Sequence, residues 1–587
     1  MRLKFFLATL LLAAVPGWAA PASDLQARRD SLNKLLAEQW EYNLSHSPEF
    51  ASILGDKRWN DKMSDFSQAA IDADLAKAKD FLQRFEAVDT TGFPEQEALN
   101  KALMVRNLKE QLDSAKFKDW LMPVNQISGI HLLAAQFPAL LTFTTVKDYD
   151  DLITRYKKFP VVFDQTIGHM RVGMAAGLMP PRFLLEKVVT QVDGLAGMTA
   201  EKSPFAAPLE KFPKEISEAE QQRIRKEMLA AITDSILPAY VKFGKFVKEE
   251  YVPKGRTEPG MWSLPDGEAR YAWNVKGSTT SDLTPEQIHQ IGLGEVTRIE
   301  GQMADLAKKL GFQDVKALNA AIEADPKRHF HSRQEIIDLY KHYIDQMWGK
   351  LPELFGRLPK AKVEVVPVEE FREKEASAAQ YDTGAPDGSR PGRVQVNTGD
   401  AEHRKTISTE STAYHEGVPG HHMQLSIAQE LPTLPPFRQQ GGYTAFVEGW
   451  ALYTESLGKE VGFYQDPYSD YGRLQDEMLR AIRLVVDTGF HSKHWTRDQV
   501  VKFFHDHSGI DEVEVQNETD RYIVWPGQAL AYKVGQLKIT ELRERAKKAL
   551  GPKFDIRKFH DEVLGAGALP LDVLEKRIDN WIAAETK

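Results

Sequence analysis

The stretch His415-Glu416-Gly417-Val418-Pro419-Gly420-His421-His422 is the one around which this 587-residue chain is organised. It places three histidines and one carboxylate within eight residues, and helix-forming sequence flanks it on both sides. Imidazole nitrogen is a common zinc ligand, and a neighbouring glutamate can take a proton from a water molecule that a metal ion activates. The stretch therefore predicts a metal site within a helical region.

The spacing departs from the H-E-x-x-H pattern, in which both histidines lie on one face of a helix and bind zinc. Pro419 stands where the second histidine would be, and it lacks the N–H that would bond to the carbonyl one turn earlier. The proline pushes Val418 out of helical geometry, and Gly420 tolerates most backbone angles. We therefore expect a bulge or break between Val418 and Gly420 that brings His421 or His422 to the position of the second ligand. The alternative is a turn that ends the helix and leaves the histidines in solvent.

Composition excludes several classes of partner. Hydrophobic residues make up 42% of the chain and charged residues 27%, as in ordinary globular proteins, and the net charge is −9. An acidic chain without a basic cluster matches neither nucleic acid nor an anionic membrane surface, so we expect neither partner. The chain has no cysteine. Zinc ligands must then be histidine and carboxylate, and neither disulfides nor lipid attachment to an N-terminal cysteine are expected.

Residues 1–20 have the three parts of a secretory signal peptide. Arg2 and Lys4 form the charged start, an apolar run follows from Phe5 to Val15, and small residues around Ala19 form a cleavage site. The apolar run is short for a bilayer core of roughly 30 Å, and no later stretch is long and apolar enough to span one. The sequence predicts an exported protein, located most simply in a bacterial periplasm, without an integral membrane segment.

The remaining chain divides into two predicted halves that form one mainly α-helical body. Residues 21–275 show apolar residues at helical spacing, and we expect this half to wall in a site formed by the second half. Prolines and glycines interrupt the helical rhythm between Tyr251 and Ser281. Residues 276–587 form the catalytic half, and its first helix has a capping-box signal at Thr284 and Gln287.

A different pattern precedes the histidine stretch. Residues 363–368 and 393–397 read as short strands, separated by a loop rich in Gly, Asp and Pro. They predict a small β-hairpin or short sheet beside the site. Its edge could pair with an extended peptide through Val394 and Val396, or the strands could form a structural hairpin that caps the helices.

Two carboxylates follow on a largely apolar helix at residues 444–455. Glu448 and Glu455 lie seven residues apart, hence on nearly the same helical face, where an unpartnered carboxylate is costly. Glu448 is the candidate third metal ligand. Glu455 could hold a ligating histidine in place, or it could form a buried ion pair with Arg480 or Arg483.

Residues nearer the C-terminus supply candidates for the other roles of a hydrolytic site. Acyl hydrolysis on zinc needs a donor for the developing oxyanion, for which we consider Tyr522, Tyr532 and His491. A peptidase that takes chain ends also needs a cation for a terminal carboxylate, for which Arg483 and Lys533 are suited.

Several motifs together resemble a known family. They are H-E-G-V-P-G-H-H at 415–422, F-V-E-G-W-A-L-Y at 446–453, R-L-V-V-D-T-G-F-H at 483–491, W-P-G-Q-A-L-A-Y-K at 525–533 and T-S-D-L-T-P-E-Q-I-H at 280–289. The chain thereby resembles the bacterial family called domain of unknown function 885. That family looks similar to helical glutamate-zincins such as thimet oligopeptidase, angiotensin-converting enzyme and carboxypeptidase Taq, which are mostly helical bodies with zinc at the floor of a deep channel.

The resemblance implies roles for residues of the central stretch. His415 is the first ligand, Glu416 the general base and Glu448 the third ligand. His421 is the first choice for the second ligand because it displaces the usual spacing least, and His422 is the alternative.

We therefore expect a periplasmic zinc metallopeptidase that binds one zinc ion per chain and cleaves short peptides in a central channel, with Glu416 as general base. Two alternatives stay open. The same site could hydrolyse a non-peptide amide or ester, or the chain could be a non-catalytic peptide-binding protein whose altered motif holds no metal.

Overall fold

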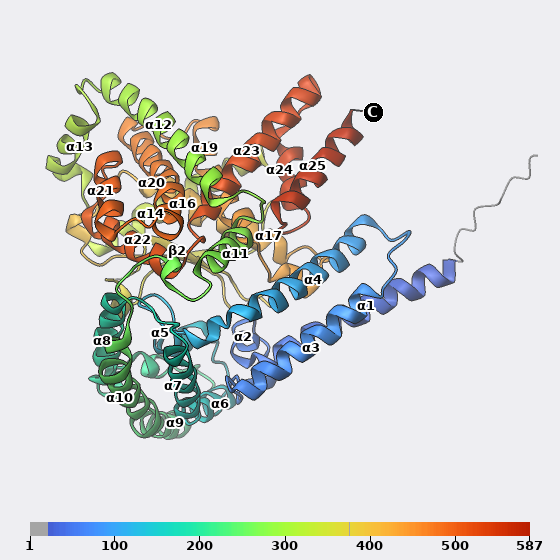
Figure 1. The fold of residues 1–587 in the computed structure, drawn as a ribbon, viewed down its shortest axis with the longest axis vertical. Coiled ribbons are helices and arrows are strands. Elements are labelled where there is room, and N and C mark those ends of the chain that lie inside the picture. Colours follow the sequence, from blue (N-terminus) through green and yellow to red (C-terminus); the bar gives the residue numbers. More distant parts are fainter. Residues whose placement is uncertain (1–21, 375, 587) are drawn as a thin grey trace, which may run out of the picture.

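The computed structural model describes residues 22–374 and 376–586, so the expected signal segment at 1–20 lies outside the described residues. About 70% of the chain is helical, and one three-stranded sheet interrupts the helices (Figure 1). The prediction of a mainly α-helical fold with a small sheet is confirmed. Within the described ranges, no helix is both long and apolar enough to cross a membrane.

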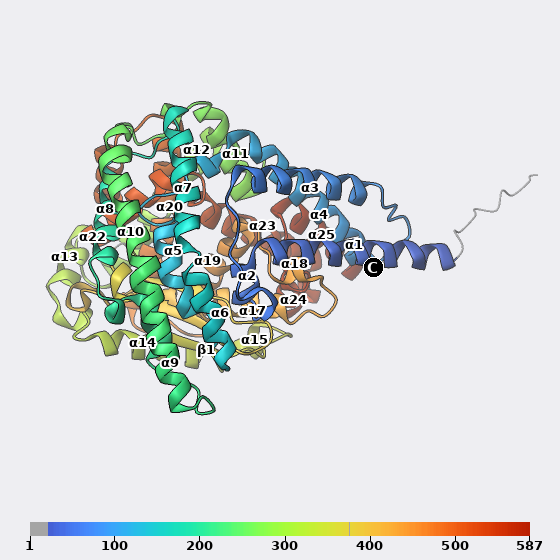
Figure 2. The same cartoon turned by 90° about the horizontal axis from the view of Figure 1, so that it is seen from below.

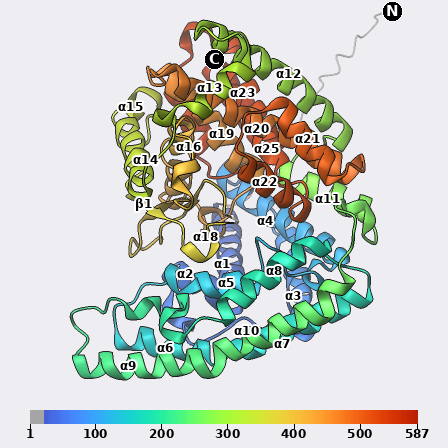
Figure 3. The same cartoon turned by 90° about the vertical axis from the view of Figure 1, so that its left-hand side faces the viewer.

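The first half of the chain forms an arm and a layer. Figures 1 and 2 show α1, α3 and α4 side by side in an arm that extends from the body, and its core contains Leu32, Phe81 and Leu108. Figure 3 shows α6, α7, α9 and α10 in a layer that lies below the rest of the molecule. The helices of this half are α1 (Ala22–His46), α2 (Pro48–Ile53), α3 (Gln68–Glu86), α4 (Glu95–Ser114), α5 (Ile130–Gln136), α6 (Val146–Tyr156), α7 (Phe159–Ala175), α8 (Arg182–Ala196), α9 (Glu218–Ala231) and α10 (Leu237–Phe246).

The segment between the halves is more regular than expected. α11 (Gly267–Thr279) lies inside the stretch from Tyr251 to Ser281, where we predicted only irregular structure. Its buried residues Tyr271 and Val275 belong to the core of the second half, whereas the main core of the first half runs from Val124 to Tyr251. The expected boundary at residues 275 and 276 would therefore cut through a helix that packs with the second half.

The second half is a bundle in which long helices pack in pairs, α12 along α20 and α19 along α23. α12 begins at the predicted capping box, since the side chains of Thr284 and Gln287 each bond to the other residue's backbone N–H. The helices of this half are α12 (Pro285–Lys309), α13 (Val315–Ala324), α14 (Arg333–Trp348), α15 (Leu351–Leu354), α16 (Thr409–Glu416), α17 (His421–Gln429), α18 (Pro436–Gln439), α19 (Thr444–Glu460), α20 (Pro467–Ser492), α21 (Arg497–His507), α22 (Glu512–Val524), α23 (Leu530–Leu550), α24 (Ile556–Leu564) and α25 (Leu571–Glu585).

The sheet corrects one part of the sequence analysis. Its strands are β1 (Val363–Pro367), β2 (Ala379–Asp382) and β3 (Gly392–Val396), in the order β1-β3-β2. The two predicted strands, β1 and β3, run parallel, and the antiparallel neighbour of β3 is β2, which the prediction missed. The missed strand reads Ala-Gln-Tyr-Asp, which is short and has no β-branched residue to signal it.

The strand order also changes which residues can meet a substrate. β3 is the central strand, and the side chains of Val394 and Val396 are 0% exposed in the core. We predicted that these two valines contact a peptide, and the structure shows that they cannot, because both neighbouring strands and the core cover them. β1 and β2 are the two edge strands.

Candidate metal centre and its cavity

The helix breaks within the predicted stretch. α16 ends at Glu416, and α17 begins at His421. The N–H of Gly420 donates to the carbonyl of Tyr414 at 3.0 Å, and the peptide bond between Val418 and Pro419 is cis. The hydrogen bond from Gly420 keeps the start of α17 close to the end of α16.

The close approach of the two helices requires a glycine at position 420. A Cβ atom at this position would collide with the carbonyl oxygens of Tyr414 and His415. Any other residue would push α17 away from α16 and separate the histidines that the two helices carry.

Three side chains from α16, α17 and α19 direct one donor atom each to a common point. Glu448 Oε2 lies 3.2 Å from His421 Nε2 and 3.7 Å from His415 Nε2. All three donor atoms lie within 4.8 Å of one another. Tetrahedral zinc with bonds of about 2.0–2.1 Å separates its ligand atoms by roughly 3.3 Å, close to these spacings. Glu448 Oε2 is buried without a hydrogen-bond partner, as expected of an atom reserved for a metal ion.

The electrostatics of the group favour a bound cation. Burial alone would lower the pKa of His415, but Glu448 and Glu455 raise that pKa to about 9. Burial would raise the pKa of Glu448, yet His421 and His415 hold it well below the usual range. Buried carboxylates thus surround the imidazoles, and a divalent cation would neutralise them.

Glu455 fills both roles that the sequence left open. Its Oε1 accepts a hydrogen bond from His415 Nδ1 at 2.8 Å and lies 3.7 Å from Arg480 Nη2. The first contact places the N–H of His415 at Nδ1, so that Nε2, which faces Glu448, could donate its electron pair to a metal ion held between them. Carboxylate–histidine pairs of this kind are typical of metal sites.

The structure separates the two candidate second ligands. His421 belongs to the cluster, whereas His422 points toward the sheet. The Nδ1 of His422 accepts from the Tyr381 hydroxyl at 3.0 Å, and its Nε2 donates to the Ala361 carbonyl at 3.2 Å. Burial lowers the pKa of His422 to about 4, so this histidine stays neutral. His422 is therefore a packing residue, and the geometry favours the first-choice ligand.

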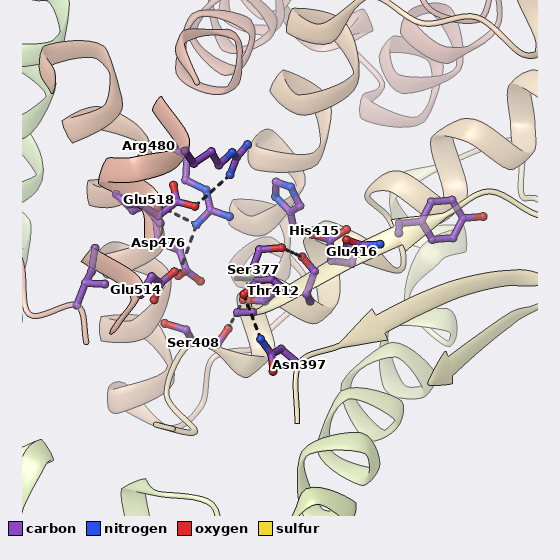
Figure 4. A pocket seen from close by; sticks show the side chains of 18 of the residues that line it. Ser377, Asn397, Ser408, Thr412, His415, Glu416, Asp476, Arg480, Glu514 and Glu518 are labelled. Atoms are coloured by element: carbon purple, nitrogen blue, oxygen red, sulfur yellow. Dashed lines mark hydrogen bonds and ion pairs between the residues drawn. The ribbon is translucent and has the colours of Figure 1, made fainter. Parts of the chain in front are cut away.

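The cluster lies on the wall of a cavity of about 490 Å³. Both halves of the chain contribute, because Gln126, Leu132 and Gln191 of the first half line it together with residues of β2, α16, α20 and α22. Figure 4 shows His415 and Glu416 beside one another, with Asp476, Arg480, Glu514 and Glu518 to their left. The edge strand β2 lines the same space through residues 379–381.

Among the remaining predicted site residues, Tyr532 and Arg483 reach the cavity. The Tyr532 ring is stacked with the His415 ring at a centroid distance of 6.2 Å, and its hydroxyl accepts a hydrogen bond from Arg521 Nη2 at 3.1 Å. Arg483 donates to Glu518 from Nη2 at 2.8 Å.

Three other predicted residues lie outside the cavity lining, which corrects those assignments. Tyr522 is fully buried, and its hydroxyl donates to Glu518 and accepts from Arg483 Nε of α20 at 2.9 Å. His491 accepts from the Met261 N–H at 3.0 Å and donates to the Tyr522 carbonyl at 2.9 Å, while burial lowers its pKa to about 3. Lys533 is buried between carboxylates of other helices. Each one already uses its polar atoms to join helices.

The sequence analysis missed several charged residues that line the cavity. They are Asp476, Glu514, Glu518 and Arg521, from α20 and α22. A signal for them exists in the spacing, because Asp476 and Arg480, like Glu514 and Glu518, are four residues apart on otherwise packed helices. The same spacing is common on solvent-exposed helices, so it does not by itself locate a site.

Comparisons with known proteins place the chain among bacterial relatives. A family model described as a bacterial protein of unknown function (DUF885) matches residues 48–578. A solved structure of a candidate lipoprotein from Colwellia psychrerythraea is 30% identical, with a TM-score of 0.89 over 95% of this chain and 99% of that one. A candidate lipoprotein of unknown function from Shewanella oneidensis shares the fold at 18% identity, with a TM-score of 0.68 over 93% of this chain and 99% of that one. No curated protein matches the chain.

Proposed function

The chain belongs to the bacterial DUF885 family, and from this premise we propose that it is a zinc-dependent peptidase that hydrolyses short peptides in the cell envelope. One observation carries the proposal. The donor atoms of His415, His421 and Glu448 converge in a cavity, and the adjacent Glu416 lines the same cavity. This set comprises the ligands and the base that zinc-dependent hydrolysis requires.

The proposed location rests on two features. Residues 1–20 resemble an export signal, and the two structural relatives are described as candidate lipoproteins, a class of envelope protein. The chain contains no cysteine that could carry a lipid anchor, so we propose export without lipid attachment.

A zinc ion held by His415, His421 and Glu448 would supply a Lewis acid and a water molecule of lowered pKa. Side chains of the protein would transfer the proton and stabilise the oxyanion. The Glu416 carboxylate accepts a proton from the attacking water and delivers it to the leaving nitrogen. The Tyr532 hydroxyl already accepts a hydrogen bond from Arg521, so its own hydrogen is free to be donated to the developing oxyanion.

The choice of a peptide over another amide or ester rests on β2. This edge strand lines the cavity, and an extended peptide can add to such an edge through main-chain hydrogen bonds. A non-peptide acyl group has no main chain to use this edge.

The test compares zinc content and peptide turnover of the mature protein with those of four variants. We expect one zinc ion per chain in the wild type. Glu416→Gln should keep the zinc and lose turnover by roughly 10²–10⁴-fold, the usual contribution of a general base. Glu448→Ala and His421→Ala should lose the zinc, and the matched control His422→Ala should keep it. A fully active Glu416→Gln variant, or full zinc occupancy in Glu448→Ala, would contradict the proposed mechanism.

A further inference from the structure

Three guanidinium groups lie beside the three candidate metal ligands. The Arg483 guanidinium lies 4.4 Å from the centroid of the Tyr532 ring, and Arg521 bonds to the hydroxyl of the same tyrosine. Arg480 approaches from α20 and reaches Glu455, the residue that holds His415. The cavity therefore has three guanidinium groups, set among the carboxylates of neighbouring residues, next to the place where hydrolysis is proposed.

The three arginines differ in how their charges are paired. Arg483 and Arg521 both donate hydrogen bonds to Glu518, at 2.8 Å and 3.1 Å. Arg480 instead lies 3.5 Å from Asp476 Oδ1 and 3.7 Å from Glu455 Oε1, distances at which it forms ion pairs without hydrogen bonds.

The free bonding capacity of Arg480 is unusual for a buried cation. Its side chain is only about a tenth exposed, its Nη1 donates to the backbone carbonyl of Asp476 at 3.1 Å, and its Nε has no partner. A guanidinium group binds a carboxylate best through two parallel N–H···O bonds, and no carboxylate of the described chain bonds to Arg480 in this way. A carboxylate arriving with a ligand would complete the pairing.

The position of Arg480 defines which part of a substrate it can reach. The contacts from His415 Nδ1 to Glu455 Oε1 and from Glu455 Oε1 to Arg480 Nη2, at 2.8 Å and 3.7 Å, place the guanidinium within about the length of two extended residues from the His415 ring. A carboxylate bound there belongs to one of the two residues that follow the cleaved bond.

We propose that Arg480 binds a carboxylate carried by one of the two residues after the cleaved bond, so that the enzyme removes one or two residues from the carboxyl end of short peptides. This inference rests on the proposed function. The carboxylate has two possible sources, the chain terminus and an acidic side chain, and the terminus is present on every peptide whatever its sequence.

The experiment uses one peptide in three forms: with a free terminal carboxylate, as its carboxamide, and as a carboxamide with glutamate after the cleaved bond. Wild-type protein should release one or two residues from the free acid, with kcat/KM at least about 10-fold above that of the plain amide, since a charged hydrogen-bond pair is lost in the amide. A preference for the glutamate amide over the plain amide would assign the carboxylate to a side chain and still support recognition by Arg480.

The variants separate recognition from folding. Arg480→Gln should raise KM for the free acid by roughly 10- to 100-fold more than KM for the plain amide, so that the preference for the free acid is lost. Arg480→Lys keeps the charge without the bidentate geometry and should fall between the two. Arg473→Gln is the matched control, because Arg473 lies on the same helix, is 8% exposed like Arg480, and pairs with Asp470 outside the cavity. This control should retain the preference for the free acid.

A binding measurement makes the test independent of turnover. In the inert Glu416→Gln background, calorimetry should show tighter binding of the free acid than of the amide, and Arg480→Gln should remove the difference. Equal cleavage of free acid and plain amide by the wild type would overturn the inference and leave the peptidase proposal intact. Absence of hydrolysis of every peptide would overturn the peptidase proposal, and equal affinities for free acid and amide would then overturn carboxylate recognition as well.

Discussion

Glu514 illustrates what single residues contribute to the cavity. Burial and the neighbouring carboxylate of Glu518 raise the pKa of Glu514 to about 7. The pKa of Glu518 is not raised in the same way, because the charges of Arg483 and Arg521 lower it to about 2 despite burial. Two carboxylates one helical turn apart thus have opposite protonation behaviour, and the arginine contacts decide which one stays charged.

The raised pKa predicts a pH-dependent stability difference for Glu514→Gln. Ionising Glu514 destabilises the folded state, because the pKa is higher in the folded than in the unfolded protein. The destabilisation is absent below about pH 4.5, develops as the pH rises, and is complete above about pH 7. The variant should therefore exceed the wild type in free energy of unfolding at pH 8 by on the order of 1–3 kcal/mol, and match it near pH 4.5. Urea denaturation at both pH values checks this, and an equal difference at the two would contradict it.

Residue types alone identified only part of the site. The His-Glu pair and the carboxylate at Glu448 were predictable, since few structural roles need two histidines and an isolated acid on packed helices. His491, Tyr522 and Lys533 are of equally suitable types, yet they bond to groups on distant segments such as Met261 and Glu295. Nothing in the local sequence shows such partners, so their structural roles could not be foreseen.

At the scale of elements, the break between α16 and α17 replaces the single helix of the usual zinc motif. Proline and glycine chemistry predicted this break, and the capping box predicted the start of α12. β2 and α11 were missed because their sequences carry weak local signals, and they form through packing against β3 and the core of the second half. Local chemistry therefore predicts where helices stop more reliably than which short segments pack.

The break predicts a large effect of Gly420→Ala. The added Cβ would collide with two carbonyl oxygens of α16, so the loop must shift, and we expect a loss of about 1–3 kcal/mol of stability together with loss of zinc. Gly301→Ala is the matched control, since Gly301 is exposed on α12 with open space around it and alanine favours helix there by roughly 1 kcal/mol. Chemical denaturation with a chelator present measures both variants. A Gly420→Ala variant as stable as wild type would show that the close approach is absent.

At the scale of the whole molecule, a metal ion bound to the three proposed ligands would connect three helices, α16, α17 and α19. A metal ion that binds only the folded state stabilises it by RT ln(1 + [L]/Kd), about 2.7 kcal/mol at 100 times Kd. The melting temperature should rise with added zinc and fall on chelation, and His421→Ala should show neither change. A melting temperature that is insensitive to zinc in the wild type would argue against the metal site. The sequence could predict this site but not its walls, because residues such as Gln126 and Arg521 meet only in the folded chain.

The shared walls of the cavity also set a size limit. A folded domain of 100 residues has a radius of gyration of about 13 Å, far too large for a space of about 490 Å³ bounded by both halves of the chain. A folded domain could therefore present only a terminus or an extended loop to the proposed metal site. The proposed enzyme would then act on short peptides and extended segments, and the folded parts of neighbouring proteins would be spared by size alone.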